Sequence, residues 1–300
     1  MYLQSLTRYR PGMPFATRAG LRFHWELGGN EAGPTLFLIR GLSRSSRYWY
    51  DLRPLLEPRF RVLVMDNRGV GRTDAPPPGF STADMADDCA AVLDQSGVHR
   101  AHVFGISLGG MIAQHLALRH PGRVDRLILG ATTMGGRRRA PVPLRAVLAF
   151  LQAARMSVAE QIRSTSPWVL DAEALARRPE IVDEWVAIAE SEPRNKASLF
   201  GQLLAAGLHD ASEHIHRIAS PTLVVTGDRD RLIPMRNSED LARSIPGATL
   251  RILPGGGHDF PTEQPENVVR VIEEFLSRGA EQRAEDAQGP DSSVVPASPR

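Results

Sequence analysis

Short apolar runs alternate with amphipathic segments along most of this 300-residue chain. The runs at 35–39 (TLFLI) and 61–65 (RVLVM) are nearly continuous, as in strands buried on both faces, whereas residues 21–27 alternate like an edge strand. Between the runs, residues 82–95 and 111–118 carry apolar side chains at helical spacing. Strands that alternate with helices predict a mostly parallel sheet flanked by helices. Further strands are expected at 101–104, 126–129, 222–226 and 249–253, and further helices at 238–244 and 265–276.

The alternation stops between residues 134 and 216, where only helical patches follow one another. A segment of this length between two core strands is too long for a loop in a compact domain. We therefore predict a helical cap at 134–216, inserted into a core domain formed by 15–133 and 217–278. The polar segment 279–300 is predicted to be disordered. Four aromatic residues of the cap either line a pocket beneath it or form its own core: Phe150, Trp168, Trp185 and Phe200.

Composition and charge narrow the functional class. The chain is 42% hydrophobic and 23% charged with a formal net charge of +2, so nothing predicts binding to nucleic acid. The single cysteine, Cys89, lies in a predicted helix and is interpreted as a small buried hydrophobic residue. Residues 1–20 contain no apolar region typical of a signal peptide, and no stretch predicts a membrane span. We therefore expect a cytoplasmic protein that makes no membrane contact.

The stretch Gly-Ile-Ser-Leu-Gly at 105–109 carries the main chemical signal. It joins a predicted strand to a predicted helix and places Ser107 at the apex of the turn. Such a turn strains the serine backbone, and side chains two positions to either side would collide, which explains Gly105 and Gly109. This arrangement is a nucleophile elbow, which exposes the serine hydroxyl at the end of a strand.

A serine nucleophile needs a histidine base and a carboxylate that orients the histidine. Of nine histidines, His258 alone lies in a glycine-rich loop directly after a predicted core strand. The strand at 222–226 is followed by Asp228 and Asp230, and Asp230 is the stronger candidate because Asp228 is placed to bond the loop backbone. The chain order Ser107, Asp230, His258 is the order that accompanies this elbow.

Acyl transfer also needs hydrogen-bond donors for the oxyanion that develops on the substrate carbonyl. The backbone N–H that follows the nucleophile belongs to Leu108. The second donor is expected in the loop after the strand at 35–39, and we assign it to Leu42. We predict neither a metal nor an organic cofactor.

With these parts placed, the chain resembles the α/β-hydrolase superfamily, and within it the capped serine hydrolases similar to 3-oxoadipate enol-lactonases and related carboxylesterases. The resemblance covers about residues 20–277. The segments that carry it are MDNRGVGRTDAP (65–76), HVFGISLGGMIAQHLALRHPGRVDRLIL (102–129), VVTGDRDRLIP (224–234) and LPGGGHDF (253–260). It implies an α/β-hydrolase fold with an inserted helical cap, and a structural role for Asp66, Arg68 and Gly69.

One departure from the family pattern concerns Arg40, which stands where relatives commonly have histidine before Gly41. Two interpretations are open. The arginine binds a substrate carboxylate, or it forms a structural ion pair with an aspartate of a neighbouring loop. Trp168 and Trp185 are further candidate substrate contacts.

These observations predict a serine hydrolase that cleaves a carboxylic ester or lactone of a small to medium organic substrate through an acyl-enzyme. The same triad also serves thioester hydrolysis, acyl transfer, perhydrolysis or C–C bond hydrolysis, because the cap and pocket select the substrate. A hydroxynitrile-type lyase and a non-catalytic ligand-binding protein are the remaining alternatives. The expected partner is a small-molecule substrate, and a homo-oligomer is compatible with the sequence.

Overall fold

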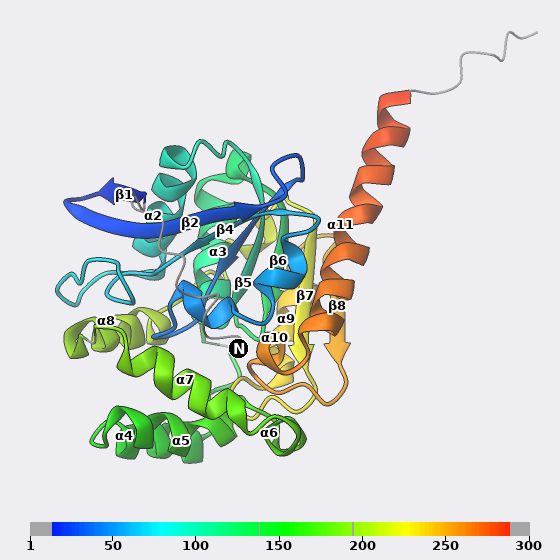
Figure 1. Ribbon diagram of the computed structural model, residues 1–300. Coiled ribbons are helices and arrows are strands. Elements are labelled where there is room, and N and C mark those ends of the chain that lie inside the picture. Colours follow the sequence, from blue (N-terminus) through cyan, green and yellow to red (C-terminus); the bar gives the residue numbers. More distant parts are fainter. Residues whose placement is uncertain (1–13, 138, 194, 289–300) are drawn as a thin grey trace, which may run out of the picture.

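The computed structural model describes residues 14–137, 139–193 and 195–288. Eight strands form one sheet in the order β1-β2-β4-β3-β5-β6-β7-β8 (Figure 1). The first pairings, β1 with β2 and β2 with β4, are antiparallel, and the remaining neighbours are parallel. The strands are β1 (Phe15–Arg18), β2 (Leu21–Gly29), β3 (Thr35–Ile39), β4 (Arg61–Met65), β5 (Ala101–Ile106), β6 (Val124–Gly130), β7 (Thr222–Gly227) and β8 (Thr249–Leu253). The mostly parallel sheet predicted from the apolar runs is confirmed.

Helices cover both faces of this sheet, because alternate residues of each buried strand point to opposite sides. Val103 of β5 packs in one apolar cluster with α2 (Thr82–Gln95), α3 (Leu108–Arg119) and α9 (Met235–Ser244). Phe104 packs in the opposite cluster with α1 (Arg53–Leu56) and α11 (Pro265–Gln288). Every residue of β5 is buried, so the strand that leads to Ser107 is held from both sides. Short helical turns complete the core: η2 (Ser46–Trp49), η3 (Pro121–Arg123), η4 (Ile215–Arg217) and α10 (Phe260–Glu263).

Five α-helices of the described residues lie between β6 and β7, in the segment for which a cap was predicted. They gather beneath the carboxyl ends of the strands in Figure 1, and we refer to them as the cap helices. Within the described part of this segment, the only β pairing is an isolated bridge between Gly135 and Asp210. The cap helices are α4 (Leu144–Ala153), α5 (Val158–Val169), α6 (Ala172–Arg177), α7 (Glu180–Glu190) and α8 (Lys196–Gly207).

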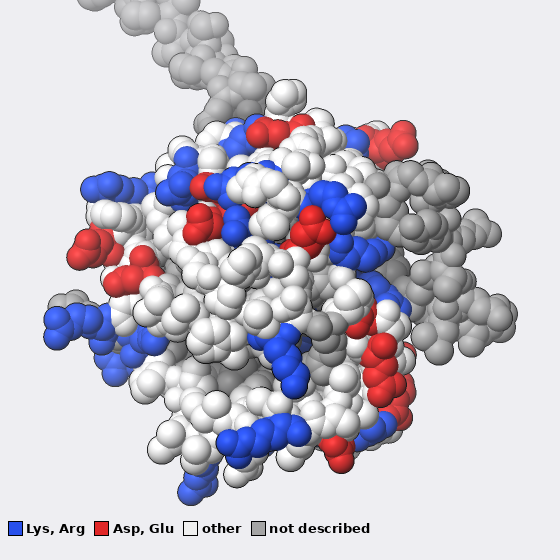
Figure 2. Space-filling model, turned by 90° about the vertical axis from the view of Figure 1, so that its left-hand side faces the viewer, with Lys and Arg blue, Asp and Glu red and all other residues white. Residues whose placement is uncertain are grey.

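The surface of the cap helices is partly apolar. Figure 2 shows charged side chains of both signs scattered over one face of the molecule, with large uncharged areas between them. Leu144 on α4 and Phe200 on α8 are 71% and 59% exposed. Phe200 therefore belongs to no core of the cap, contrary to one of the two interpretations of that residue.

Two sequence predictions outside the site have clear outcomes. Cys89 is a free, fully buried thiol on α2, as predicted. The prediction of disorder from residue 279 is wrong up to Gln288, because α11 continues to that residue. Residues 280–288 are rich in Ala, Glu, Gln and Arg, which propagate a helix that has already started even without apolar side chains to bury. The rest of the predicted segment, 289–300, lies outside the described residues.

Candidate active site

Ser107 occupies the turn between β5 and α3 with φ 56° and ψ −121°, a conformation that L-residues rarely adopt. A Cβ added to Gly105 would lie 2.2 Å from the carbonyl oxygen of Gly109, and one added to Gly109 would lie 2.1 Å from that of Ile39. The steric role predicted for both glycines is therefore confirmed. The turn is further held by two 2.8 Å hydrogen bonds: the Ser107 N–H donates to the Gly130 carbonyl, and the Thr132 hydroxyl donates to the Ser107 carbonyl.

The loop that follows β3 lies directly against this serine. A Cβ added to Gly41 would be 3.1 Å from Ser107 Cβ and 3.6 Å from Ser107 Oγ. Leu42 follows Gly41 in this loop, and Leu108 is the first residue of α3. The first N–H groups of a helix have no carbonyl partner within the helix and carry a positive partial charge. Both candidate oxyanion donors thus lie on segments that border the serine hydroxyl.

His258 contacts Asp230, with 2.9 Å between its Nδ1 and Asp230 Oδ2. The Asp230 side chain is completely buried, and its other oxygen accepts 2.8 Å hydrogen bonds from the N–H groups of Leu232 and Ile233. Asp228 points elsewhere and accepts a 2.7 Å hydrogen bond from the Gly255 N–H. Of the two candidate acids, the structure therefore brings Asp230 against His258 and Asp228 against the loop backbone.

The electrostatics around His258 stabilise its protonated form relative to a free histidine. Burial by itself would lower its pKa, but the Asp230 carboxylate, with smaller contributions from Asp259 and Glu263, raises the pKa above the ordinary histidine value. Because Asp230 accepts the hydrogen bond at Nδ1, that nitrogen carries a proton and Nε2 is left to exchange one.

The loops after β3 and β8 are joined by a buried ion pair. The Arg40 guanidinium donates two hydrogen bonds to the Asp259 carboxylate, at 2.8 and 3.0 Å, and stacks 4.5 Å from the centre of the Trp49 ring. Burial would raise the pKa of Asp259, but the charge of Arg40, followed by that of Arg44, lowers it overall. Asp259 is adjacent to His258 in the chain, so this ion pair holds the His258 loop against the loop after β3, which borders Ser107. Of the two interpretations of Arg40, the structure shows the ion pair.

Comparison with known families supports the assignment of the fold. A family model described as alpha/beta hydrolase fold matches residues 34–265. The chain belongs to the α/β-hydrolase fold family.

Individual relatives of this family agree. The chain is 33% identical over 259 residues to a protein of Variovorax paradoxus (strain S110) named "Putative carbamate hydrolase RutD", covering 85% of this chain and 96% of the relative. Est816, described as an N-acyl homoserine lactone degrading enzyme, is 29% identical with a TM-score of 0.74, covering 87% of this chain and 100% of its own. The enol-lactonase from Burkholderia xenovorans LB400 shares the fold, with a TM-score of 0.78, 24% identity and coverage of 88% and 100%. The protein is thus a hydrolase of the α/β fold.

Glu263 is a residue of this α/β-hydrolase site that the sequence analysis missed. Its carboxylate accepts a 2.6 Å hydrogen bond from the Gly257 N–H and a 2.8 Å bond from the Asp171 N–H. It therefore connects the His258 loop to the start of cap helix α6. Burial raises the pKa of Glu263 to about 7, despite these two bonds. The sequence signal for Glu263 was its position five residues after His258, and that spacing does not by itself predict a contact with the His258 loop.

The two tryptophans proposed as substrate contacts differ in position. Trp185 on α7 is fully buried in a cluster with Tyr48, Leu170, Ile181 and Ile188, which joins the cap helices to the core. Trp168 on α5 is partly buried, and the Arg231 guanidinium lies 5.0 Å from its ring centre. Trp185 therefore has a packing role whether or not a substrate touches its edge.

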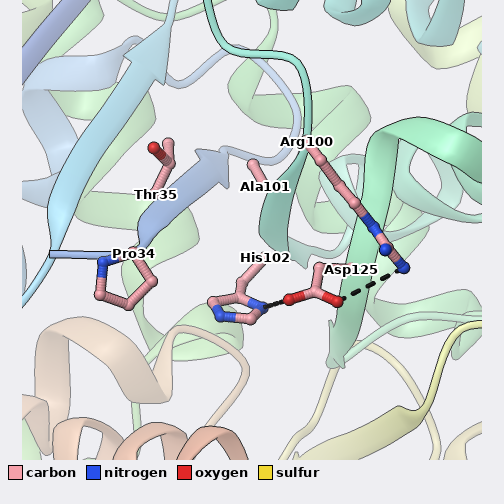
Figure 3. A pocket seen from close by; sticks show the side chains of 6 residues that line it. All are labelled: Pro34, Thr35, Arg100, Ala101, His102 and Asp125. Carbon is pink, nitrogen blue, oxygen red and sulfur yellow. Dashed lines mark ion pairs between the residues drawn. The ribbon is translucent and has the colours of Figure 1, made fainter. Parts of the chain in front are cut away.

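A hollow of about 330 Å³ lies at the other end of the parallel strands, where their amino ends meet. Figure 3 shows Arg100 and His102 directed toward Asp125, with ion-pair distances of 3.4 and 3.3 Å. These residues belong to the amino ends of β5 and β6, at the far end of β5 from Ser107. The hollow is lined by Pro34, Thr35, Arg100, Ala101, His102 and Asp125.

The described residues contain no group of three or more histidine, cysteine or acidic side chains arranged to hold a metal ion. None of their helices has both the length and the hydrophobicity that a membrane span requires.

Proposed function

We propose that this hydrolase cleaves a carboxylic ester or lactone of a small to medium organic acid through a covalent acyl-enzyme on Ser107. The observation that carries the proposal is the 2.9 Å contact between His258 and Asp230, in a loop tied by Arg40 and Asp259 to the segment that borders Ser107. A strained serine, a histidine with its carboxylate and two backbone donors are the parts that acyl transfer requires.

The first half of the reaction acylates the enzyme. Ser107 Oγ attacks the substrate carbonyl while His258 Nε2 takes the hydroxyl proton, and the electron pair of the C=O bond moves to oxygen. The N–H groups of Leu42 and Leu108 stabilise this oxyanion. Asp230 keeps the histidine in the required tautomer and stabilises the imidazolium. When the carbonyl re-forms, the alkoxide leaves and receives the proton from His258.

The second half releases the acid. His258 takes a proton from a water molecule, the hydroxide attacks the acyl carbon, and Ser107 leaves with the proton returned by His258. In a lactone the leaving alkoxide stays attached to the acyl group, so one ring-opened hydroxy acid is the product.

Carbamate hydrolysis is the second candidate, because the Variovorax relative carries that name at 33% identity. The same attack on the carbamate carbonyl would apply, with a nitrogen on the acyl carbon that makes it less electrophilic. The lactone-degrading description of Est816 at 29% identity favours the ester or lactone reaction. Thioester hydrolysis, acyl transfer, perhydrolysis and C–C bond hydrolysis use the same residues and are outcomes of the same screen.

The experiment is to label the purified protein with a fluorophosphonate probe and to screen esters, lactones, carbamates and thioesters. We expect labelling and turnover that the Ser107→Ala variant loses, with kcat reduced at least about 10⁴-fold. Ser164→Ala, at an exposed position of α5, is the matched control and should keep both. Unchanged turnover in Ser107→Ala would refute the acyl-enzyme, and turnover of carbamates alone would select the second candidate.

A further inference from the structure

Arg44 lies two residues after Leu42 in the loop that borders Ser107. Its guanidinium lies against two aromatic rings that meet edge to face, 3.7 Å from the ring centre of Trp185 and 4.4 Å from that of Tyr48. Trp185 comes from cap helix α7 and is fully buried, and Tyr48 comes from the core and is 4% exposed. The positive charge of Arg44 therefore lies at the contact between the cap helices and the core.

This charge has no carboxylate partner among the residues that the structure describes. No acidic oxygen of these residues forms an ion pair with Arg44, and its buried Nη1 has no hydrogen-bond acceptor. Asp259 is close enough for Arg44 to lower its pKa, but both oxygens of Asp259 are already bound by Arg40. Burial lowers the pKa of the Arg44 guanidinium, which remains charged at neutral pH as arginine does in proteins.

Neighbouring arginines contrast with this arrangement. Arg40 has Asp259, Arg68 has Asp88, and Arg178 on the cap has Asp51 at 2.9 Å. Arg44 is partly buried, and a buried donor such as its Nη1 costs free energy while it lacks an acceptor, a cost that a ligand carboxylate would offset. The Arg44 guanidinium carries N–H donors in the fork geometry that a carboxylate accepts with both oxygens, and its Nη1 has no acceptor among the described residues.

We infer that Arg44 binds a carboxylate of the substrate, so that the preferred substrate is an anionic ester, lactone or carbamate rather than a neutral one. The inference rests on the proposed function, since it assigns the carboxylate to the substrate that Ser107 attacks. The carboxylate sits on the short acyl portion, because Arg44 shares its loop with Leu42, the candidate donor to the reacting carbonyl. Arg40, the first candidate for this role, is excluded by its own ion pair with Asp259.

A matched pair of chromogenic substrates tests this assignment. 4-Nitrophenyl butyrate and 4-nitrophenyl hemisuccinate have acyl chains of the same length and differ by a terminal carboxylate. We expect the wild type to prefer the hemisuccinate through a lower KM, and Arg44→Met to reduce the ratio of the two kcat/KM values about 100-fold. Any loss of packing in the variant affects both substrates and cancels in the ratio. Arg44→Lys should recover part of the ratio through its charge.

Arg47→Met is the control, since Arg47 lies in the same segment, is partly exposed and bonds Ser191 on the cap. It should leave the ratio unchanged. An Arg44→Met ratio equal to that of the wild type, or a wild type without preference for the anionic substrate, would overturn the inference.

A binding measurement tests carboxylate recognition by Arg44 independently of whether Ser107 is the nucleophile. Calorimetric titration of Ser107→Ala with monomethyl succinate should give an affinity that falls at least about tenfold when Arg44→Met is added. Methyl butyrate, the neutral counterpart, should bind both proteins alike. If Arg44→Met does not fold, Arg44→Lys is used in both assays, and an unaltered preference and affinity in that variant contradicts a bidentate carboxylate contact. Failure of Ser107 as nucleophile leaves the binding difference intact.

Discussion

Both ends of the parallel strands carry a histidine beside an aspartate, but only one end has the other requirements of catalysis. His258 and Asp230 lie at the carboxyl ends, 2.9 Å apart, and His102 and Asp125 lie at the amino ends, 3.3 Å apart. Both histidine side chains are almost fully buried. The hollow in Figure 3 lies beside the second pair. Neither a His–Asp contact nor a nearby hollow therefore identifies the site.

The difference lies in the direction of the chain. Helix α3 begins directly after Ser107, so its positive end faces the carboxyl end of β5. At the amino ends, α2 and α3 have just finished, at Gln95 and Arg119, and helix C-termini carry negative partial charge. A developing oxyanion is stabilised at the first end and disfavoured at the second. A serine in strained backbone is likewise found at the turn where a strand becomes a helix.

The largest expected difference is in kcat, between variants of the two aspartates. Asp230→Asn should lower kcat about 10³- to 10⁴-fold, because His258 then loses the charge that sets its tautomer and stabilises its protonated form. Asp125→Asn should change kcat less than about threefold. Steady-state kinetics on the best substrate of the screen measures both. A comparable loss in the two variants would show that the amino-end pair matters for turnover.

The two arginines that contact an aspartate at these ends give the second comparison. Arg40→Met leaves Asp259 buried without a partner and should lower the free energy of unfolding by about 3–5 kcal/mol. Arg100, which is 56% exposed beside Asp125, should contribute less than about 1 kcal/mol when changed to methionine. Urea denaturation followed by circular dichroism measures both. Equal losses would mean that the Arg40 pair is solvated.

At the carboxyl end, Glu263 should make stability depend on pH. The pKa of Glu263 rises from 4.5 to about 7 in the folded protein. Between these pH values the folded state holds more protons on this carboxyl than the unfolded chain, so its contribution to stability falls as pH rises, by about 3 kcal/mol in all. Glu263→Gln should remove this part of the slope in urea unfolding between pH 5 and 8. An identical slope in the variant argues against a raised pKa.

The smallest effect concerns two hydroxyl groups that bond strand-end carbonyls. Thr132 donates to the Ser107 carbonyl at 2.8 Å, and Ser220 donates to the Val124 carbonyl at the amino end of β6 at 3.1 Å. Thr132→Val and Ser220→Ala should each cost about 1 kcal/mol of stability. Only Thr132→Val should also lower kcat, by a few-fold, because its partner is the elbow. A kcat decrease in Ser220→Ala would contradict this separation.

The parts of the site that the sequence analysis predicted are those set by local chain geometry. Gly105 is needed because an added Cβ would lie 2.2 Å from the Gly109 carbonyl oxygen in the same turn, whereas Gly109 is also needed for the approach of β3, whose Ile39 carbonyl oxygen would lie 2.1 Å from its Cβ. Asp230 was preferred over Asp228 from its place in the turn. One of its oxygens accepts hydrogen bonds from the N–H groups of Leu232 and Ile233, two and three residues further along. The end of α11 was missed because helix propagation depends on propensity as well as on burial.

Hydrophobic period and glycine placement act over a few residues, so the strands, the turns and the residues at the strand ends follow from the local sequence. The charges around the site depend instead on contacts between segments far apart in the chain. Arg40 and Asp259 are 219 positions apart, and Glu263 reaches Asp171 across 92 positions. Arg40 and Arg44 look equivalent in the sequence, yet Arg40 pairs with Asp259 of a distant loop whereas Arg44 lies against one ring from the core and one from the cap helices. Such ion pairs form only when the loops after β3 and β8 and the cap helices come together. A local sequence pattern therefore does not show which distant carboxylate pairs with a given arginine.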